Sequence, residues 1–209
     1  MFDYINISIL AIFIPTFFFV SITPGMCMTL ALSMGMSIGL KKTIYMMAGE
    51  LLGVALVATS SVIGVAAIML NHPTIFIVLK YAGGAYLIYL GIAMWLSRGK
   101  MALNLEECNY NISKKSLAIQ GFVTAIANPK GWAFFIALLP PFIDENLEYV
   151  PQLAVLISLI LLLEFSCLII YATGGTTLRK LLQNSSNVKL LNKIAGSMMI
   201  GIGIWLALT

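Results

Sequence analysis

Three ionisable side chains, Glu50, Lys130 and Glu164, stand inside segments that are otherwise apolar. A charged side chain at the centre of a bilayer costs roughly 2.5–3.5 kcal/mol on insertion scales, so such residues generally line a pathway or pair with one another. Lys130 is suited to hold a carboxylate, and Glu50 or Glu164 to hold an ammonium group or carry a proton. Two alternatives stay open: a Glu–Lys pair that only fixes helix contacts, and a position of Glu50 nearer the membrane interface, because Lys42 precedes it closely.

Two prolines interrupt apolar segments, each beside a polar residue. The motifs are Thr23-Pro24-Gly25 and Asn128-Pro129-Lys130. A proline inside a helix lacks an N–H and pushes away the carbonyl four residues earlier, so we expect free carbonyls at Val20 and Ala125. Broken backbone at membrane depth persists only inside protein or beside water, and half-helix ends attract ions. The pair of breaks therefore predicts a central polar cavity, with two plain structural kinks as the alternative.

The elements that must position these residues are membrane-spanning helices. Of the 209 residues, 60% are apolar and 10% are charged, and the mean hydropathy is +0.99, whereas soluble domains carry about 25% charged residues. A spanning helix needs about 20 apolar residues. We therefore predict an all-α membrane protein with one transmembrane domain over residues 1–209 and a first span that is retained rather than cleaved. The six predicted spans cover about 4–40, 43–70, 75–96, 116–143, 150–173 and 190–209.

The basic residues predict the orientation of these spans. Ten of the twelve fall in or beside the loops after spans 1, 3 and 5, whereas the opposite loops hold His72 and acidic residues. Because cytoplasmic loops are enriched in lysine and arginine, we place these three loops in the cytoplasm and both termini outside. The ten residues are Lys41, Lys42, Arg98, Lys100, Lys114, Lys115, Arg179, Lys180, Lys189 and Lys193.

The two halves of the chain resemble each other. Span 3 contains the pattern Lys-x-Ala-Gly from Lys80 to Gly83, and span 6 repeats it from Lys193 to Gly196. Three spans per half is an odd number, so the second half enters the membrane from the opposite side, as in inverted-repeat transporters. We predict halves at about 1–97 and 116–209, joined by a cytoplasmic loop at 98–115. Chance similarity of short glycine-rich helices, which also favour close packing, is the alternative.

Several classes of function lack the residues that they need. The cysteines Cys27, Cys108 and Cys167 form no CxxC motif and no cluster with histidine, so we expect no metal and no cofactor. No basic arm indicates nucleic acid, and no nucleophile–base pair indicates an enzyme. A metal-ion or small-cation exporter stays an alternative, as does, more remotely, a thiol-redox protein acting through Cys27. The twelve methionines are interpreted as packing residues rather than copper ligands.

The motifs together resemble one family. They are Ile22-Thr23-Pro24-Gly25, the stretch from Leu79 to Gly91, Gly121-Phe122 followed by Asn128-Pro129-Lys130, then Phe134-Phe135 and Leu139-Pro140. Over nearly the whole chain, this set resembles the lysine exporter (LysE/RhtB) family of bacterial amino-acid translocators. The chain departs from the family's usual pattern where Met26 and Cys27 follow Gly25, and where Val54 follows Gly53 with the acid, Glu50, a turn earlier.

The resemblance implies a multi-pass protein of the bacterial inner membrane that exports amino acids or related small metabolites, driven by the proton gradient. The substrate-binding and translocation residues would then be Thr23, Pro24, Gly25, Glu50, Asn128, Pro129, Lys130 and Glu164. In alternating access, the substrate's carboxylate would meet Lys130 and half-helix N–H groups, and its ammonium would meet freed carbonyls or a glutamate. The substrate, the stoichiometry and the glutamate that carries the proton stay open, and a homo-oligomer is compatible with the sequence.

Overall fold

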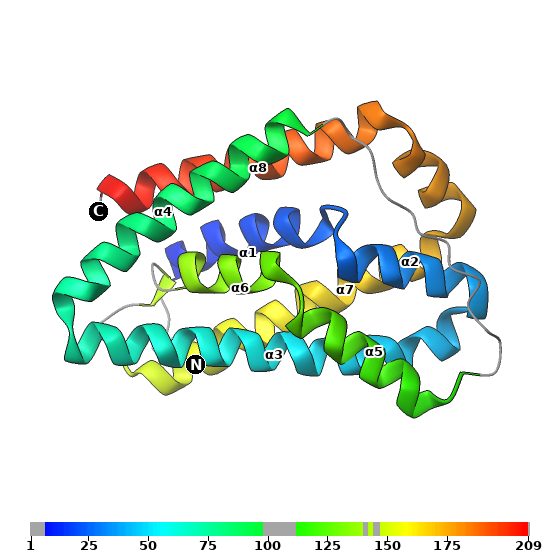
Figure 1. Cartoon of the computed structure of the whole chain (residues 1–209), viewed down its shortest axis with the longest axis horizontal. Coiled ribbons are helices and arrows are strands. Elements are labelled where there is room, and N and C mark those ends of the chain that lie inside the picture. The colour runs from blue at the N-terminus through cyan, green and yellow to red at the C-terminus, as the bar shows by residue number, and fades with distance from the viewer. Residues whose placement is uncertain (1–6, 98–111, 140–141, 144–146, 209) are drawn as a thin grey trace.

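The computed structural model describes residues 7–97, 112–139, 142–143 and 147–208, and helices make up nearly all of them (Figure 1). No strand occurs within these ranges. The helices are α1 (Ile7–Ile22), α2 (Met26–Ile38), α3 (Leu40–Asn71), α4 (Pro73–Leu96), α5 (Lys114–Ile126), α6 (Pro129–Leu138), α7 (Tyr149–Gln183) and α8 (Ser185–Leu208). The predicted loop 98–115 lies largely outside the described residues.

Two of the described helices are long and apolar enough to cross a membrane, over Leu40–Gly64 in α3 and Tyr149–Gly175 in α7. Helices α1 and α2 are long and apolar enough only when taken together as one bent pair, with an angle of 58° at the break. Residues 81–96 of α4 form a shorter apolar helix. The chain is therefore a helical membrane protein, and the helix break predicted near Pro24 is present. The count of six spans stays a prediction.

The predicted spans follow the order of the helices, but their bounds differ, most clearly at the end of span 5 and the start of span 6. We expected span 5 to end at about Thr173, but α7 continues to Gln183 through a kink at Gly175, where φ is +46°. Glycine adopts this left-handed region without steric cost, so the chain turns there and resumes the helix. The next helix, α8, begins at Ser185, earlier than the predicted Leu190.

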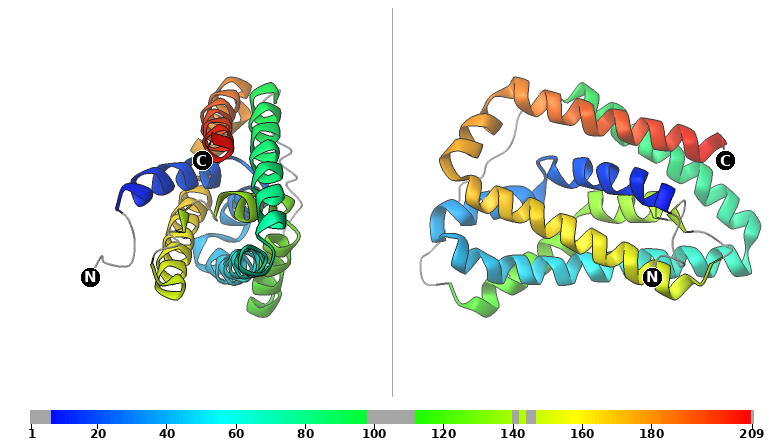
Figure 2. Two further views of the ribbon diagram at one scale, coloured as in Figure 1. Left: turned by 90° about the vertical axis from the view of Figure 1, so that its left-hand side faces the viewer. Right: turned by 180° about the vertical axis from the view of Figure 1, so that it is seen from behind.

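The helices pack in three groups, which Figures 1 and 2 show from three sides: α3 with α5, α4 with α8, and α7 with the broken pair α1 and α2. Along one side α3 packs against α5, and along another α4 packs against α8. Helix α7 runs along both halves of the broken first span and also contacts α3. The short helices α1 and α6 lie between the α4–α8 pair and α3. The two predicted breaks therefore come to the middle of the bundle.

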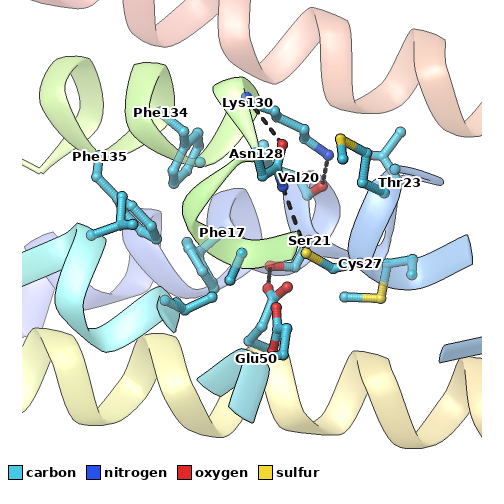
Figure 3. Close-up of a pocket in the computed structure, with 18 residues that line it drawn as sticks. Phe17, Val20, Ser21, Thr23, Cys27, Glu50, Asn128, Lys130, Phe134 and Phe135 are labelled. Atoms are coloured by element: carbon cyan, nitrogen blue, oxygen red, sulfur yellow. Dashed lines mark hydrogen bonds between the residues drawn. The ribbon is translucent and has the colours of Figure 1, made fainter. Parts of the chain in front are cut away.

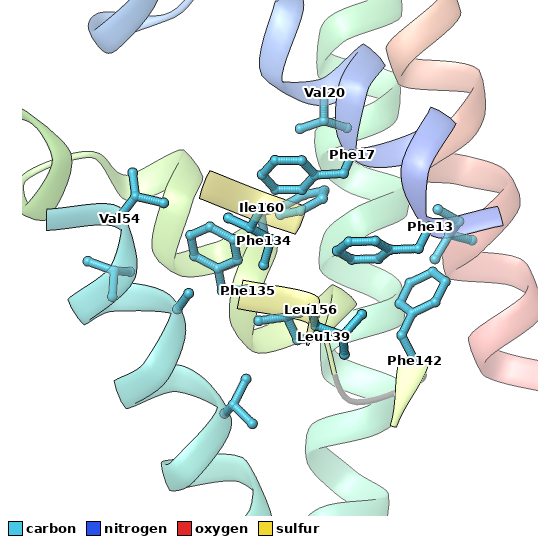
Figure 4. Packing of buried hydrophobic residues seen from close by; sticks show 14 of the residues in the cluster. Phe13, Phe17, Val20, Val54, Phe134, Phe135, Leu139, Phe142, Leu156 and Ile160 are labelled. Atoms are coloured by element: carbon cyan, nitrogen blue, oxygen red, sulfur yellow. The ribbon is translucent and has the colours of Figure 1, made fainter. Parts of the chain in front are cut away.

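Two apolar clusters fill the interior on either side of the breaks. The first contains the stacked and edge-on aromatic rings of Phe13, Phe17, Phe134, Phe135 and Phe142 (Figure 4). The second is rich in methionine. It includes Met28, Met34, Met46 and Met47, all at most 2% exposed. The interpretation of these methionines as packing residues is consistent with their burial in the core.

Close contacts between helices depend on glycine at the crossing points. A Cβ atom added to Gly49 would overlap the carbonyl oxygen of Ala118 in α5. A Cβ added to Gly91 would lie 2.6 Å from the carbonyl oxygen of Gly196, and one added to Gly196 would lie 2.6 Å from that of Gly91. The α3–α5 and α4–α8 pairs therefore approach backbone to backbone, as small residues allow in membrane proteins.

We expect Gly49→Ala to destabilise the protein by about 1–3 kcal/mol, because the new methyl group meets backbone, which cannot rotate away. The measurement is thermal unfolding of the full chain in detergent. Gly64→Ala is the matched control in the same helix, since a Cβ there has nothing within 4 Å. The control should be neutral or stabilising by about 0.5–1 kcal/mol. Equal melting temperatures for the two variants would contradict the close contact.

Candidate functional site

The break in the first span exposes backbone carbonyls at the end of α1, and side chains from other helices bind them. The predicted free carbonyl of Val20 is present, and the Lys130 Nζ donates to it at 2.8 Å. The Thr23 hydroxyl donates to the Phe19 carbonyl at 2.6 Å, and the Tyr171 hydroxyl of α7 donates to the Ile22 carbonyl at 2.7 Å. The last turn of α1 is thus held open by donors from its own end, from α6 and from α7.

The break in span 4 has a different local structure. Asn128 is the N-cap of α6, and its side-chain oxygen accepts a hydrogen bond from the Lys130 N–H at 3.1 Å. Pro129 occupies the first helical position, where a backbone N–H would have no partner within the helix, so the missing N–H of proline costs nothing there. The expectation of a free carbonyl at Ala125 is wrong, because the Asn128 N–H donates to it at 3.2 Å. Ala127 keeps a helical conformation, so the chain closes a tight turn before the proline.

Both breaks face one cavity of about 60 Å³, which has room for a few water molecules. Six of the eight predicted site residues line it: Thr23, Gly25, Glu50, Asn128, Lys130 and Glu164. The other two, Pro24 and Pro129, form the breaks themselves. Residues that the sequence analysis did not select complete the lining: Phe17, Val20, Ser21, Met26, Cys27, Met28, Val54, Val57, Ala125, Gly131, Phe134 and Phe135.

The two glutamates come together from α3 and α7 and differ in their surroundings. The Glu164 carboxylate accepts a hydrogen bond from the Ser21 hydroxyl and interacts electrostatically with the Lys130 ammonium. Glu50 is completely buried within the protein. Neither of its carboxyl oxygens has a hydrogen-bond partner in the part of the chain that the structure describes. Its carboxyl lies close to that of Glu164 and to the Cys27 thiol.

The amide of Asn128 links the two breaks directly. Its Nδ2 lies 3.7 Å from the sulfur of Cys27, at the start of α2, while its oxygen caps α6. Figure 3 shows this contact beside the bond from Lys130 to Val20. The two breaks are therefore joined by two side chains of one motif.

The cavity has a polar side and an apolar side. In Figure 3 the rings of Phe17, Phe134 and Phe135 lie toward one end, away from Lys130, Asn128 and Cys27. Val54 and Val57 line the cavity as well and belong to the same apolar cluster as these rings. An amphiphilic molecule with charged groups at one end fits this division.

Sequence reasoning missed three kinds of lining residue, and a signal existed for two of them. Ser21 lies in the last turn before the first break, and a side chain in that turn lies near the break. Phe134 follows Lys130 by four residues, and such residues share a helix face. The nearness of Cys27 to Glu50 depends on how α2 packs against α3, for which no local pattern gives a signal.

Comparisons with known proteins give the family. An uncharacterised membrane protein of Vibrio cholerae is 28% identical over 187 residues, which is 90% of either chain. The homoserine/homoserine lactone efflux protein of Salmonella typhimurium is 26% identical over 90% of either chain, and the leucine efflux protein of an Enterobacter species is 28% identical over 91% of this chain and 90% of its own. No solved structure matches. The sequence model of the LysE type translocators matches residues 18–209, and the chain therefore belongs to the LysE type translocator family.

Proposed function

We propose that this protein is a secondary transporter that exports amino acids or related small metabolites across the bacterial inner membrane in exchange for protons. The observation that carries the proposal is the cavity between the two helix breaks, with one lysine and two glutamates in its wall. The printed functions of two relatives, homoserine and leucine efflux, point to the same class of substrate.

The cavity wall offers a partner for each part of an amino acid. Lys130 uses one of its three donors on the Val20 carbonyl, so two remain for a substrate carboxylate. The half-helices α2 and α6 begin beside the cavity, and helix N-termini favour anions. The ammonium of the substrate would meet Glu50 or Glu164, and an uncharged side chain would lie against the rings around Phe134.

The packing of the helices supports two inverted repeats of three spans each. Spans 1, 2 and 3 are α1 with α2, α3, and α4, and spans 4, 5 and 6 are α5 with α6, α7, and α8. Exchanging the halves turns the packing of span 2 on span 4 into that of span 5 on span 1, and both pairs occur. The same exchange maps the α4–α8 pair onto itself. That pair is antiparallel, since Gly91 meets Gly196 and Gly203 meets Gly84, which agrees with opposite entry of the two halves.

Transport would follow from a rearrangement of the two halves around the cavity. Because the regular helical hydrogen bonding is interrupted at each break, the halves of each span can tilt separately. A glutamate in the wall that takes up a proton from outside would couple outward movement of substrate to inward movement of protons. The basic loops would lie in the cytoplasm and both termini outside, as the distribution of lysine and arginine favours.

The rival functions gain no support from the site. Within the described residues, no three histidine, cysteine or acidic side chains come close enough to bind a metal ion. Cys27 and Cys167 are both free and buried. A thiol-redox function would require Cys27 to react, and that requirement is testable.

The central test is an efflux screen with the intact chain. Cells that overexpress it should tolerate toxic analogues of the exported amino acids and accumulate the natural ones outside. We expect Lys130→Ala to lower export at least tenfold, because the variant loses both the substrate's carboxylate partner and the bond to Val20. The matched control is Lys189→Ala, an exposed lysine in α8. Normal export by a well-expressed Lys130→Ala variant would remove the role of this lysine.

The orientation is tested by reporter fusions. Alkaline phosphatase fused after the last residue should be active, because the C-terminus is expected outside, and green fluorescent protein in the same place should stay dark. The same reporters fused after Lys100 should behave in the opposite way. A fluorescent C-terminal fusion would contradict the outside placement of the C-terminus.

Chemical blocking of Cys27 separates transport from thiol chemistry. Methyl methanethiosulfonate should inhibit export by the wild type, because the adduct fills the small cavity beside Glu50. Cys27→Ser should export normally and resist the reagent, and Cys167→Ser should remain sensitive. Loss of function in Cys27→Ser with preserved folding would favour the redox alternative instead.

A further inference from the structure

We propose that Glu50 is the group at which the proton and the substrate's ammonium replace each other, while Glu164 remains a fixed carboxylate. This inference rests on the proposed function and deepens it, because it assigns different tasks to the two glutamates. It starts from the contrast between them: Glu164 has a hydroxyl donor and a nearby cation, whereas among the described residues Glu50 has only the Cys27 thiol and the Glu164 carboxyl close to it.

A buried carboxylate without donors or a cation is strongly unfavourable, so the group takes up a proton instead. Glu50 is 0% exposed, and both of its oxygens lack a hydrogen-bond partner among the described residues. Glu50 nevertheless belongs to the residues that line the cavity. It is therefore a neutral acid when no cation is present, and an incoming ammonium is the kind of group that can take over from the proton.

No other charged or titratable group in the cavity wall can exchange a proton for an ammonium in this way. The cavity wall contributes Cys27 from α2, Lys130 from α6 and Glu164 from α7, in addition to Glu50 from α3. The lysine ammonium and the Glu164 carboxylate interact and balance each other's charge. When Glu50 is ionised, a single ammonium group supplies the positive charge that its carboxylate needs, and the carboxylate of an amino acid would share the Lys130 ammonium with Glu164.

The repeat accounts for why only one glutamate is left without partners. The number of residues between Lys80 and Lys193 differs by only one from the number between Glu50 and Glu164. When the repeated lysines are aligned, the two glutamates therefore occupy equivalent places in the two halves. Ser21 and Lys130, the partners of Glu164, have no such counterparts in the other half.

Aligning the two prolines pairs Ser21 with Ile126 and Lys130 with Gly25. An isoleucine and a glycine can neither donate from a side chain nor supply a charge. The same scaffold therefore holds one carboxylate that is permanently satisfied and one that depends on what enters the cavity.

The exchange balances in charge and atoms. The Glu50 carboxylic acid gives its proton to a water molecule as the substrate's ammonium forms an ion pair with the resulting carboxylate. Release of the substrate to the outside leaves the carboxylate unpaired, and it takes a proton from that side. The proton then leaves to the cytoplasm only when the next ammonium arrives, which couples one proton to one ammonium.

The test uses dicyclohexylcarbodiimide, a reagent that adds to protonated carboxyl groups in apolar surroundings, on the purified full chain in lipid nanodiscs. Peptide mass spectrometry should locate the adduct at Glu50 at neutral pH, and labelling should be lost at alkaline pH. Glu50→Gln, which keeps the shape of the side chain, should abolish the adduct. Glu148→Gln is the matched control, because Glu148 is exposed outside the cavity, and it should label like the wild type.

A mixture of the proteinogenic amino acids with L-homoserine should slow the labelling of Glu50. An adduct at Glu164, no adduct at either glutamate, or labelling that the mixture leaves unchanged would each overturn the inference. Should Glu50→Gln fail to fold, the position of the adduct in the wild type and its dependence on pH still decide. Failure of the inference is distinct from failure of the proposed function, because export by wild-type cells tests only the latter.

Discussion

The structure of the site depends on one constraint: in a membrane, every backbone carbonyl must find a donor within the protein or in trapped water. Pro24 takes away the donor that would serve Val20, and the ammonium of Lys130 supplies a replacement from another helix. A hydrogen bond from a charged donor contributes about 1.5–3 kcal/mol, which is comparable to what insertion of a lysine costs. The two unfavourable features therefore offset each other, and neither would persist alone.

The same constraint explains why the two breaks differ although both contain a proline. In span 4 the turn at Ala127 lets the Asn128 N–H serve the Ala125 carbonyl, so no distant donor is needed. In span 1 the chain is extended at Gly25, and carbonyls at the end of α1 accept hydrogen bonds from side chains of α6 and α7. One break is thus closed by its own backbone, and the other remains dependent on residues that are far away in the sequence.

Much of this arrangement could be predicted from the sequence, because the strongest signals are local. Proline in an apolar helix, a cap residue before it and rare charges at membrane depth identified six of the residues that line the cavity, and the position of the first break was correct. The fate of the Ala125 carbonyl was not predictable, since it depends on the backbone angles of a single residue. The partner of Lys130 and the unpartnered state of Glu50 follow from how α3, α6 and α7 meet, and no periodic pattern encodes this.

The apolar side of the cavity has a consequence for its polar side. The rings of Phe17, Phe134 and Phe135 pack against one another and against buried aliphatic side chains, so they exclude water from one end of a space that is already small. Low local polarity strengthens every interaction between charges and raises the cost of leaving one unpaired. An amino acid that enters this space brings a positive and a negative group together with an apolar or small side chain. It can therefore satisfy the carboxyl of Glu50, the free donors of Lys130 and the aromatic wall at once, whereas a simple cation would satisfy only the first of them.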